Sequence, residues 1–130
     1  MFKKHQIIET GLQHGTVSIV VNKEVYEVTT YRLDGTYSDG RHPDKVKYTR
    51  SLEEDLIRRD FTINAIAYDG KDNIIGVENS LSDMKSKTIR CVGDAFKRLD
   101  EDPLRIIRAF RFQAVLGFDI EDQTHQAMIT

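Results

Sequence analysis

The deciding stretch of this sequence is Arg58-Arg59-Asp60-Phe61-Thr62-Ile63-Asn64-Ala65. It places two cations, a carboxylate and a carboxamide at the start of a mostly apolar run that ends at Tyr68. Charges crowd the entrance of a buried element chiefly where a ligand binds. A second charged stretch, Glu101-Asp102-Pro103-Leu104-Arg105-Ile106-Ile107-Arg108, follows further along the chain. Together the two stretches predict a site for an anionic ligand that also needs polar recognition, as a nucleotide does.

The composition sets limits on this interpretation. A chain of 130 residues with 39% apolar and 31% charged residues is typical of one folded domain and excludes a disordered chain. The net charge of -2 excludes attraction of nucleic acid by the whole surface, so a local cluster must hold any polyanion. The single cysteine, Cys91, excludes an internal disulfide and a cysteine-rich zinc site, and we predict that it is buried. No apolar run approaches the roughly 20 residues of a membrane span and no signal peptide opens the chain, so we expect no membrane partner and a cytoplasmic setting.

Local patterns predict the elements of residues 1–92. A capping box at Ser51 and Glu54 predicts a helix from Leu52 to about Arg59, and a short helix is expected over 80–87. Residues 33–43 contain Asp-Gly twice and a proline, so we predict a loop there, which is either a flap beside the substrate or an inert surface loop. Strands are predicted by β-branched and aromatic residues over 16–21, 25–32, 45–49, 65–68, 73–77 and 88–92, with turns at Asn22-Lys23-Glu24 and Asp69-Gly70.

From residue 93 the pattern is helical. Asp102 suits a helix N-cap, Pro103 the first helical position and Gly117 the helix end. A further helix is expected to begin near Asp122 and to be cut off at Thr130. The sequence therefore predicts a mixed α+β domain over residues 1–92 and the start of an all-α region over residues 93–130.

Residue chemistry predicts the two parts of a nucleotide site. Guanidinium groups bind phosphates at two points, so Arg59 is a candidate phosphate ligand. Asp60 and Asn64 are four residues apart and could hold a ribose from one face of a helical turn. A carboxylate beside a guanidinium presents acceptors and donors side by side, so Asp102 and Arg105 could read the edge of a base.

Arg105, Arg108 and Arg111 recur at every third position and so line one side of a helix, where an anion would offset their mutual repulsion. Purely structural interpretations remain open at this point. Arg58 and Arg59 suit a solvated helix end near the C-terminal dipole. Asp102 suits a plain N-cap with Arg105 as its ion-pair partner.

Both charged stretches and their surroundings resemble the family of tRNA nucleotidyltransferases (CCA-adding enzymes) and bacterial poly(A) polymerases. The matching segments cover nearly the whole chain, in order: Gly11-Leu12-Gln13-His14-Gly15-Thr16-Val17, Tyr26-Glu27-Val28-Thr29-Thr30-Tyr31-Arg32, Asp39-Gly40-Arg41-His42-Pro43, Ser51-Leu52-Glu53-Glu54-Asp55-Leu56, Arg58 to Ala65, Val92-Gly93-Asp94 and Glu101-Asp102-Pro103-Leu104-Arg105. The resemblance implies a DNA-polymerase-β-like nucleotidyltransferase head followed by the start of a helical neck. It also implies addition of CMP and AMP to the tRNA 3′ end from CTP and ATP, with Mg²⁺ and no nucleic-acid template.

The resemblance implies a role for each site residue. Arg59 and Asp60 would hold the triphosphate and the ribose, with Asn64 in support. Asp102 and Arg105 would read the base edge of C or A. Two further roles are implied, namely phosphate or template contacts for Arg108 and a third active-site carboxylate for Glu27.

The chain also departs from the family pattern. The family's Gly-Gly-x-Val-Arg-Asp segment and its catalytic Asp-x-Asp pair are absent, and the only Asp-x-Asp is Asp100-Glu101-Asp102. Two-metal phosphoryl transfer needs closely spaced carboxylates, which Glu27 alone cannot supply. We therefore expect a head truncated at its N-terminus that binds Mg²⁺ poorly and does not catalyse by itself. Residues 75–79 also replace an Asp-Pro-Phe-like turn.

Other functions stay open within this framework. A poly(A) polymerase or an enzyme that adds only CC or only A would carry the same motifs. A non-catalytic module that binds nucleotide or RNA is a second class. We also expect that missing upstream strands expose a sheet edge at Val17 to Val21, through which the chain could self-associate.

Overall fold

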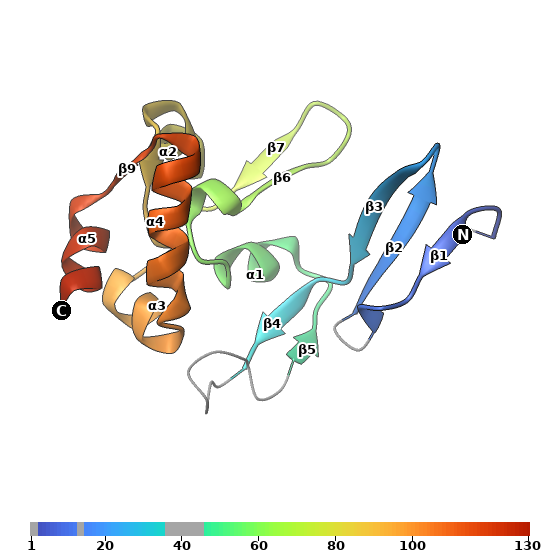
Figure 1. Cartoon of the computed structure of the whole chain (residues 1–130), viewed down its shortest axis with the longest axis horizontal. Helices are drawn as coiled ribbons and strands as arrows, with labels where there is room; N and C mark the ends of the chain where they lie inside the picture. Colours follow the sequence, from blue (N-terminus) through green and yellow to red (C-terminus); the bar gives the residue numbers. More distant parts are fainter. Residues whose placement is uncertain (1–2, 13–14, 36–45) are drawn as a thin grey trace.

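The computed structural model describes residues 3–12, 15–35 and 46–130. In Figure 1 a three-stranded sheet occupies the end of the molecule that holds the N-terminus, and three helices gather at the opposite end. The strands form several small sheets, and the helices pack beside them. The predicted mixed α+β class is confirmed, although the strands lie in separate small sheets instead of one mixed sheet.

The N-terminal sheet is antiparallel and has the order β1-β2-β3, with β1 at Gln6–Ile8, β2 at Thr16–Val21 and β3 at Glu24–Thr29. Asn22 and Lys23 both have positive φ, as in the two-residue turns that match the twist of a hairpin. This confirms the predicted hairpin and shortens its turn. The predicted free edge at Val17 to Val21 is wrong, because β2 is the central strand and pairs on both sides.

The chain leaves this sheet after Thr29, so the strand predicted to continue to Arg32 is interrupted. A new strand, β4 (Arg32–Asp34), pairs with β5 (Val46–Tyr48), and Leu33 lies opposite Lys47. The predicted loop therefore starts later than Leu33, since pairing with β5 extends the chain there. Residues 36–43 of that loop, the candidate flap, lie outside the described residues.

Helix α1 spans Leu52–Ile57 and is capped as predicted at its first turn. The Ser51 hydroxyl accepts from the backbone N–H of Glu54 at 3.3 Å. The second half of the capping box is wrong, because the Glu54 carboxylate accepts a hydrogen bond from the Thr49 hydroxyl. The backbone N–H of Ser51 donates instead to that Thr49 hydroxyl oxygen, at 3.1 Å.

The middle of the chain follows the predicted pattern closely. A short 3₁₀ helix, η2 (Thr62–Asn64), leads into the hairpin of β6 (Ile66–Tyr68) and β7 (Ile74–Gly76), and α2 (Ser80–Ser86) precedes β8 (Thr88–Ile89). Asn79, with φ of 65°, stands directly before α2, where the family has an Asp-Pro-Phe-like turn.

The C-terminal part holds α3 (Ala95–Glu101), α4 (Leu104–Leu116) and α5 (Asp122–Ile129). Gly117 ends α4 as predicted, with φ of 67° and its N–H bonded to the carbonyl of Gln113 at 2.9 Å. The prediction that only helices follow residue 93 is wrong at β9 (Asp119–Ile120), which pairs parallel with β8. A two-residue strand carries too little pattern to be seen in sequence.

The main core joins both predicted regions. Its buried members are Phe61, Ile63, Ile89, Cys91, Ala95, Leu99 and Ala109. The prediction of a buried cysteine is confirmed, because Cys91 is 2% exposed. The division at residue 92 stays a prediction, and the core includes residues on both sides of it. Among the described residues, no helix is both long and apolar enough to cross a membrane.

Candidate nucleotide site

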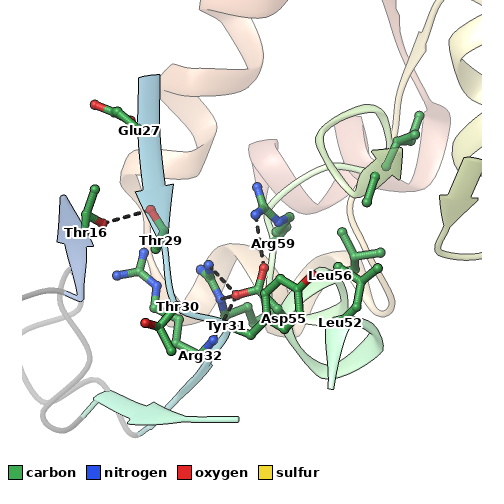
Figure 2. Close-up of a pocket in the computed structure, with 13 residues that line it drawn as sticks. Thr16, Glu27, Thr29, Thr30, Tyr31, Arg32, Leu52, Asp55, Leu56 and Arg59 are labelled. Atoms are coloured by element: carbon green, nitrogen blue, oxygen red, sulfur yellow. Dashed lines mark hydrogen bonds and ion pairs between the residues drawn. The ribbon is translucent and has the colours of Figure 1, made fainter. Parts of the chain in front are cut away.

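A pocket of about 490 Å³ opens between β3, β4 and α1 (Figure 2). We call it the Asp55 pocket, because the carboxylate of Asp55, 3% exposed, receives most of the hydrogen bonds inside it. Its Oδ1 accepts from the backbone N–H of Arg32 at 3.0 Å and from Nε and Nη2 of Arg58 at 3.1 and 3.0 Å. Its Oδ2 accepts from Nη2 of Arg59 at 3.1 Å. One buried carboxylate therefore orients the side chains of two arginines.

The charge of the Asp55 pocket is positive. Arg32, Arg58 and Arg59 line it together with Asp55 and Glu27, so three cations against two carboxylates leave a formal charge of +1. Burial by itself would raise the pKa of Asp55, but the Arg32 N–H, the Arg59 hydrogen bond and the charge of Arg58 together bring that pKa below its ordinary value. Asp55 is therefore ionised at neutral pH, and the surplus positive charge favours an anionic ligand.

The predicted ribose residues lie together in a second cluster. Oδ1 of Asp60 accepts from Nδ2 of Asn64 at 3.1 Å and from the backbone N–H of Phe61 at 2.8 Å. Oδ2 of Asp60 accepts from Nε of Arg108 at 2.6 Å. Asp60 is 9% exposed, and the Arg108 guanidinium also lies 5.3 Å from the ring centre of Phe112. The geometry joins three predicted site residues, although Arg59 turns toward the Asp55 pocket instead.

The predicted base-reading pair lies at the start of α4. Asp102 caps this helix, because its Oδ1 accepts from the N–H of Leu104 at 3.1 Å. Arg105 is 5% exposed, and its Nη1 donates to the carbonyl of Arg98 at 2.6 Å and to Oε2 of Glu101 at 3.1 Å. The expected single-sided arginine stripe therefore divides: Arg105 is buried, whereas Arg108 and Arg111 are exposed. The base-reading role stays a prediction.

Glu27, the candidate third carboxylate, is exposed on β3. In Figure 2 its side chain lies at the edge of the Asp55 pocket and points away from Arg59. Over residues 3–12, 15–35 and 46–130, no group of three or more His, Cys, Asp or Glu side chains is placed to hold a metal ion. The described residues therefore do not form a fit for Mg²⁺, and the structure assigns no step to that ion.

Sequence reasoning missed two residues that organise the site. Asp55 lies three and four positions before Arg58 and Arg59, and this helical spacing is a usable signal for ion pairs. Arg98 bonds backbone carbonyls of Ile57 and Arg58, about forty residues earlier in the chain. No local pattern predicts such a contact.

The comparison with known families decides what this arrangement belongs to. A family model described as the poly A polymerase head domain matches residues 1–90, which is more than half of the chain. The chain belongs to the poly A polymerase head domain family. This finding confirms the resemblance that the sequence motifs indicate.

Within this family the similar curated proteins are bacterial CCA-adding enzymes. The chain is 51% identical to the CCA-adding enzyme of Leuconostoc mesenteroides over 125 residues, which are 96% of this chain and 31% of that protein. It is 50% identical to the CCA-adding enzyme of Streptococcus sanguinis over 121 residues, covering 93% of this chain and 30% of that protein. The chain thus spans about a third of the length of these relatives.

Solved structures of the poly A polymerase head domain family agree with the fold. The crystal structure of the Bacillus stearothermophilus CCA-adding enzyme in complex with CTP matches with a TM-score of 0.83 and 44% identity, covering 94% of this chain and 29% of that one. A tRNA nucleotidyltransferase complexed with a primer tRNA and an incoming ATP analog matches with a TM-score of 0.71 and 31% identity, covering 95% and 33%.

Proposed function

We propose that this chain is the nucleotide-binding head region of a CCA-adding tRNA nucleotidyltransferase. Such an enzyme adds CMP and AMP to the 3′ end of tRNA from CTP and ATP, without a nucleic-acid template. The observation that carries the proposal is the 51% identity, over 96% of this chain, to a curated CCA-adding enzyme. The similar structure in complex with CTP supports the same substrate class.

The proposed site has two halves. The phosphate-and-sugar half consists of Arg59, Asp60 and Asn64, and the base-reading half consists of Asp102 and Arg105. The positive charge of the Asp55 pocket supports phosphate binding beside Arg59. A hydroxyl of a ribose can donate to a carboxylate oxygen, which supports the assignment of Asp60 to the sugar.

Arg108 is proposed to assist the phosphates, since its side chain is 46% exposed and reaches the phosphate-and-sugar half through Asp60. We further propose that the intact enzyme uses Mg²⁺ to stabilise charge during nucleotidyl transfer, with Glu27 as a supplementary carboxylate. The division into a head over residues 1–92 and a neck from residue 93 and the cytoplasmic setting both stay predictions.

Calorimetric titration of this chain with CTP, ATP, GTP and UTP tests the proposal. We expect CTP and ATP to bind and GTP and UTP to bind more weakly. Asp102→Ala and Arg105→Ala are expected to weaken binding of CTP and ATP, whereas Asp100→Ala, an exposed carboxylate on α3, serves as the matched control. If Asp102→Ala and Arg105→Ala stay folded and bind as tightly as the parent chain, the base-reading assignment is wrong.

The name of the matching family favours one alternative. A poly(A) polymerase uses ATP alone, and the model that matches residues 1–90 is named for that activity. Binding of ATP without binding of CTP would support this alternative. An enzyme adding only CC or only A, or a non-catalytic module that binds nucleotide or RNA, would be separated from it by assay of nucleotide addition to tRNA with the full-length protein.

A further inference from the structure

Arg98 of α3 connects segments that are distant in sequence. Its Nε donates to the carbonyl of Val92 at 3.1 Å, its Nη2 to that of Ile57 at 3.0 Å, and its Nη1 lies 3.5 Å from that of Arg58. Nη1 also pairs with Oε2 of Glu101 at 3.1 Å. One guanidinium thus holds the end of α1, the segment before α3 and the end of α3 itself.

The backbone of Arg98 contacts the opposite half of the proposed site. Its carbonyl accepts the 2.6 Å hydrogen bond from Nη1 of Arg105. Glu101 receives both guanidinium groups, because its Oε2 lies 3.1 Å from Nη1 of Arg98 and 3.1 Å from Nη1 of Arg105. The base-reading half is therefore attached to the same residue that holds the end of α1.

The contacts at α1 have a clear physical purpose. The last carbonyls of a helix lack partners within the helix, and α1 has no basic residue in its own last turn. Arg98 supplies donors and positive charge to that end from another element. Its side chain is 16% exposed, so water replaces few of these bonds if the guanidinium is removed. Arg59 follows directly after the carbonyls that Arg98 holds.

We propose that Arg98 is a positioning residue that sets the spacing between the phosphate-and-sugar half and the base-reading half of the nucleotide site. The inference rests on the proposed function for the roles of Arg59 and Arg105. A nucleotide spans both halves, so a change in their spacing misplaces the base when the phosphates are bound. Selection of C and A over other bases therefore depends on Arg98 through the protein backbone.

The spacing can be measured without any nucleotide. Spin labels on Glu53→Cys in α1 and Ile107→Cys in α4 occupy exposed positions, and Cys91, 2% exposed, does not compete for the label. Pulsed electron spin resonance should give one narrow distance distribution in the parent chain, and a broadened or shifted one in Arg98→Met. Arg90→Met is the matched control, because Arg90 binds Asp83 and Glu121. Its label distances should not change.

Nucleotide titration of the same variants gives a second readout. Arg98→Met should bind CTP about tenfold more weakly, which is about 1.4 kcal/mol, and should lose its preference for CTP over UTP. Arg98→Lys keeps the charge but not the planar fork, and is expected to lie between parent and Arg98→Met in both measurements. It replaces Arg98→Met if that variant does not fold.

The two proposals fail separately. Absence of nucleotide binding by the parent chain contradicts the proposed function, whereas the label distances decide the role of Arg98 by themselves. An unchanged distance distribution in folded Arg98→Met and Arg98→Lys overturns the inference. Equal loss of base preference in Arg90→Met also overturns it, because general destabilisation then explains the effect.

Discussion

Nε of Arg108 lies 2.6 Å from Oδ2 of Asp60 and so joins the middle of α4 to the segment that follows α1. The carboxylate is 9% exposed and the arginine side chain 46% exposed, so the pair lies at the boundary between core and solvent. A ligand phosphate competes for the arginine, and a ligand hydroxyl competes for the carboxylate. The same ion pair therefore stabilises the free protein and is open to exchange with substrate.

Replacement of Arg108 tests the contribution of this pair to stability. Arg108→Met should lower the free energy of unfolding by about 1–2 kcal/mol, because it leaves a nearly buried carboxylate with fewer donors while solvent screens part of the loss. Urea denaturation measures the change. Arg111→Met, an exposed arginine on the same helix, should stay within about 0.5 kcal/mol of the parent chain. Equal effects of the two substitutions would contradict the prediction.

Asp55 should be more important for stability than any other residue of the Asp55 pocket. Asp55→Asn removes the charge that pairs with Arg58, whose side chain is 15% exposed, and with the more exposed Arg59. We expect a loss of about 2–3 kcal/mol, below the range for fully buried pairs because Arg59 is partly solvated. Chemical denaturation of Asp55→Asn and of the exposed control Asp100→Asn checks this. A loss no larger than that of the control would show that the pocket does not depend on this charge.

The stability of the protein should fall in acid. Burial raises the pKa of Asp55 and of Glu121, but hydrogen bonds and nearby arginines outweigh burial, so both pKa values are lower in the folded protein than their ordinary values of 3.8 and 4.5. Each group therefore stabilises the fold above its ordinary pKa, and this stabilisation is lost as the pH falls through the folded value. Unfolding followed from pH 7 to pH 3 should show a decline that begins below about pH 5.

A comparison of variants identifies the groups responsible for that decline. Asp55→Asn cannot titrate at this position, so its stability should change less between pH 7 and pH 3 than that of the parent chain. Glu121→Gln should have the same direction of effect, because Glu121 accepts from the backbone N–H of Thr124 at 2.8 Å. An unchanged pH profile in both variants would assign the acid sensitivity to other carboxylates.

The thiol of Cys91 should react slowly in the native protein. Burial raises its pKa to about 11, and the side chain is 2% exposed. Because the thiolate is the reactive form, we expect reaction with a disulfide reagent at pH 8 to be at least about 100-fold slower in the native chain than in urea. Similar rates in the two states would show that the core around this residue opens readily.

Local signals were sufficient for much of the fold. Asn22-Lys23 and Asp69-Gly70 mark turns, Ser51 marks a helix start, and Gly117 marks a helix end, since each residue type suits the backbone conformation found there. These features depend on neighbours within a few residues. The order of the main elements therefore followed from the sequence.

Long-range pairings could not be predicted in the same way. β1 and β9 are short, and their existence depends on β2 and β8, which lie elsewhere in the chain. The candidate site shows the same limit. The neighbourhood of Asp60 and Asn64 followed from their spacing, whereas the contact between Arg108 and Asp60 and those made by Arg98 require the folded chain.

The parallel pair of β8 and β9 has a consequence for the order of folding during synthesis. The amides of Asp119 and Glu121 bond to the carbonyls of Lys87 and Ile89, and the amide of Cys91 bonds to the Thr124 hydroxyl. A ribosome that has released only the residues up to α4 has not yet supplied these partners. The segment 87–91 must therefore wait for about thirty further residues before its backbone is satisfied, which makes this half of the protein a late-closing unit.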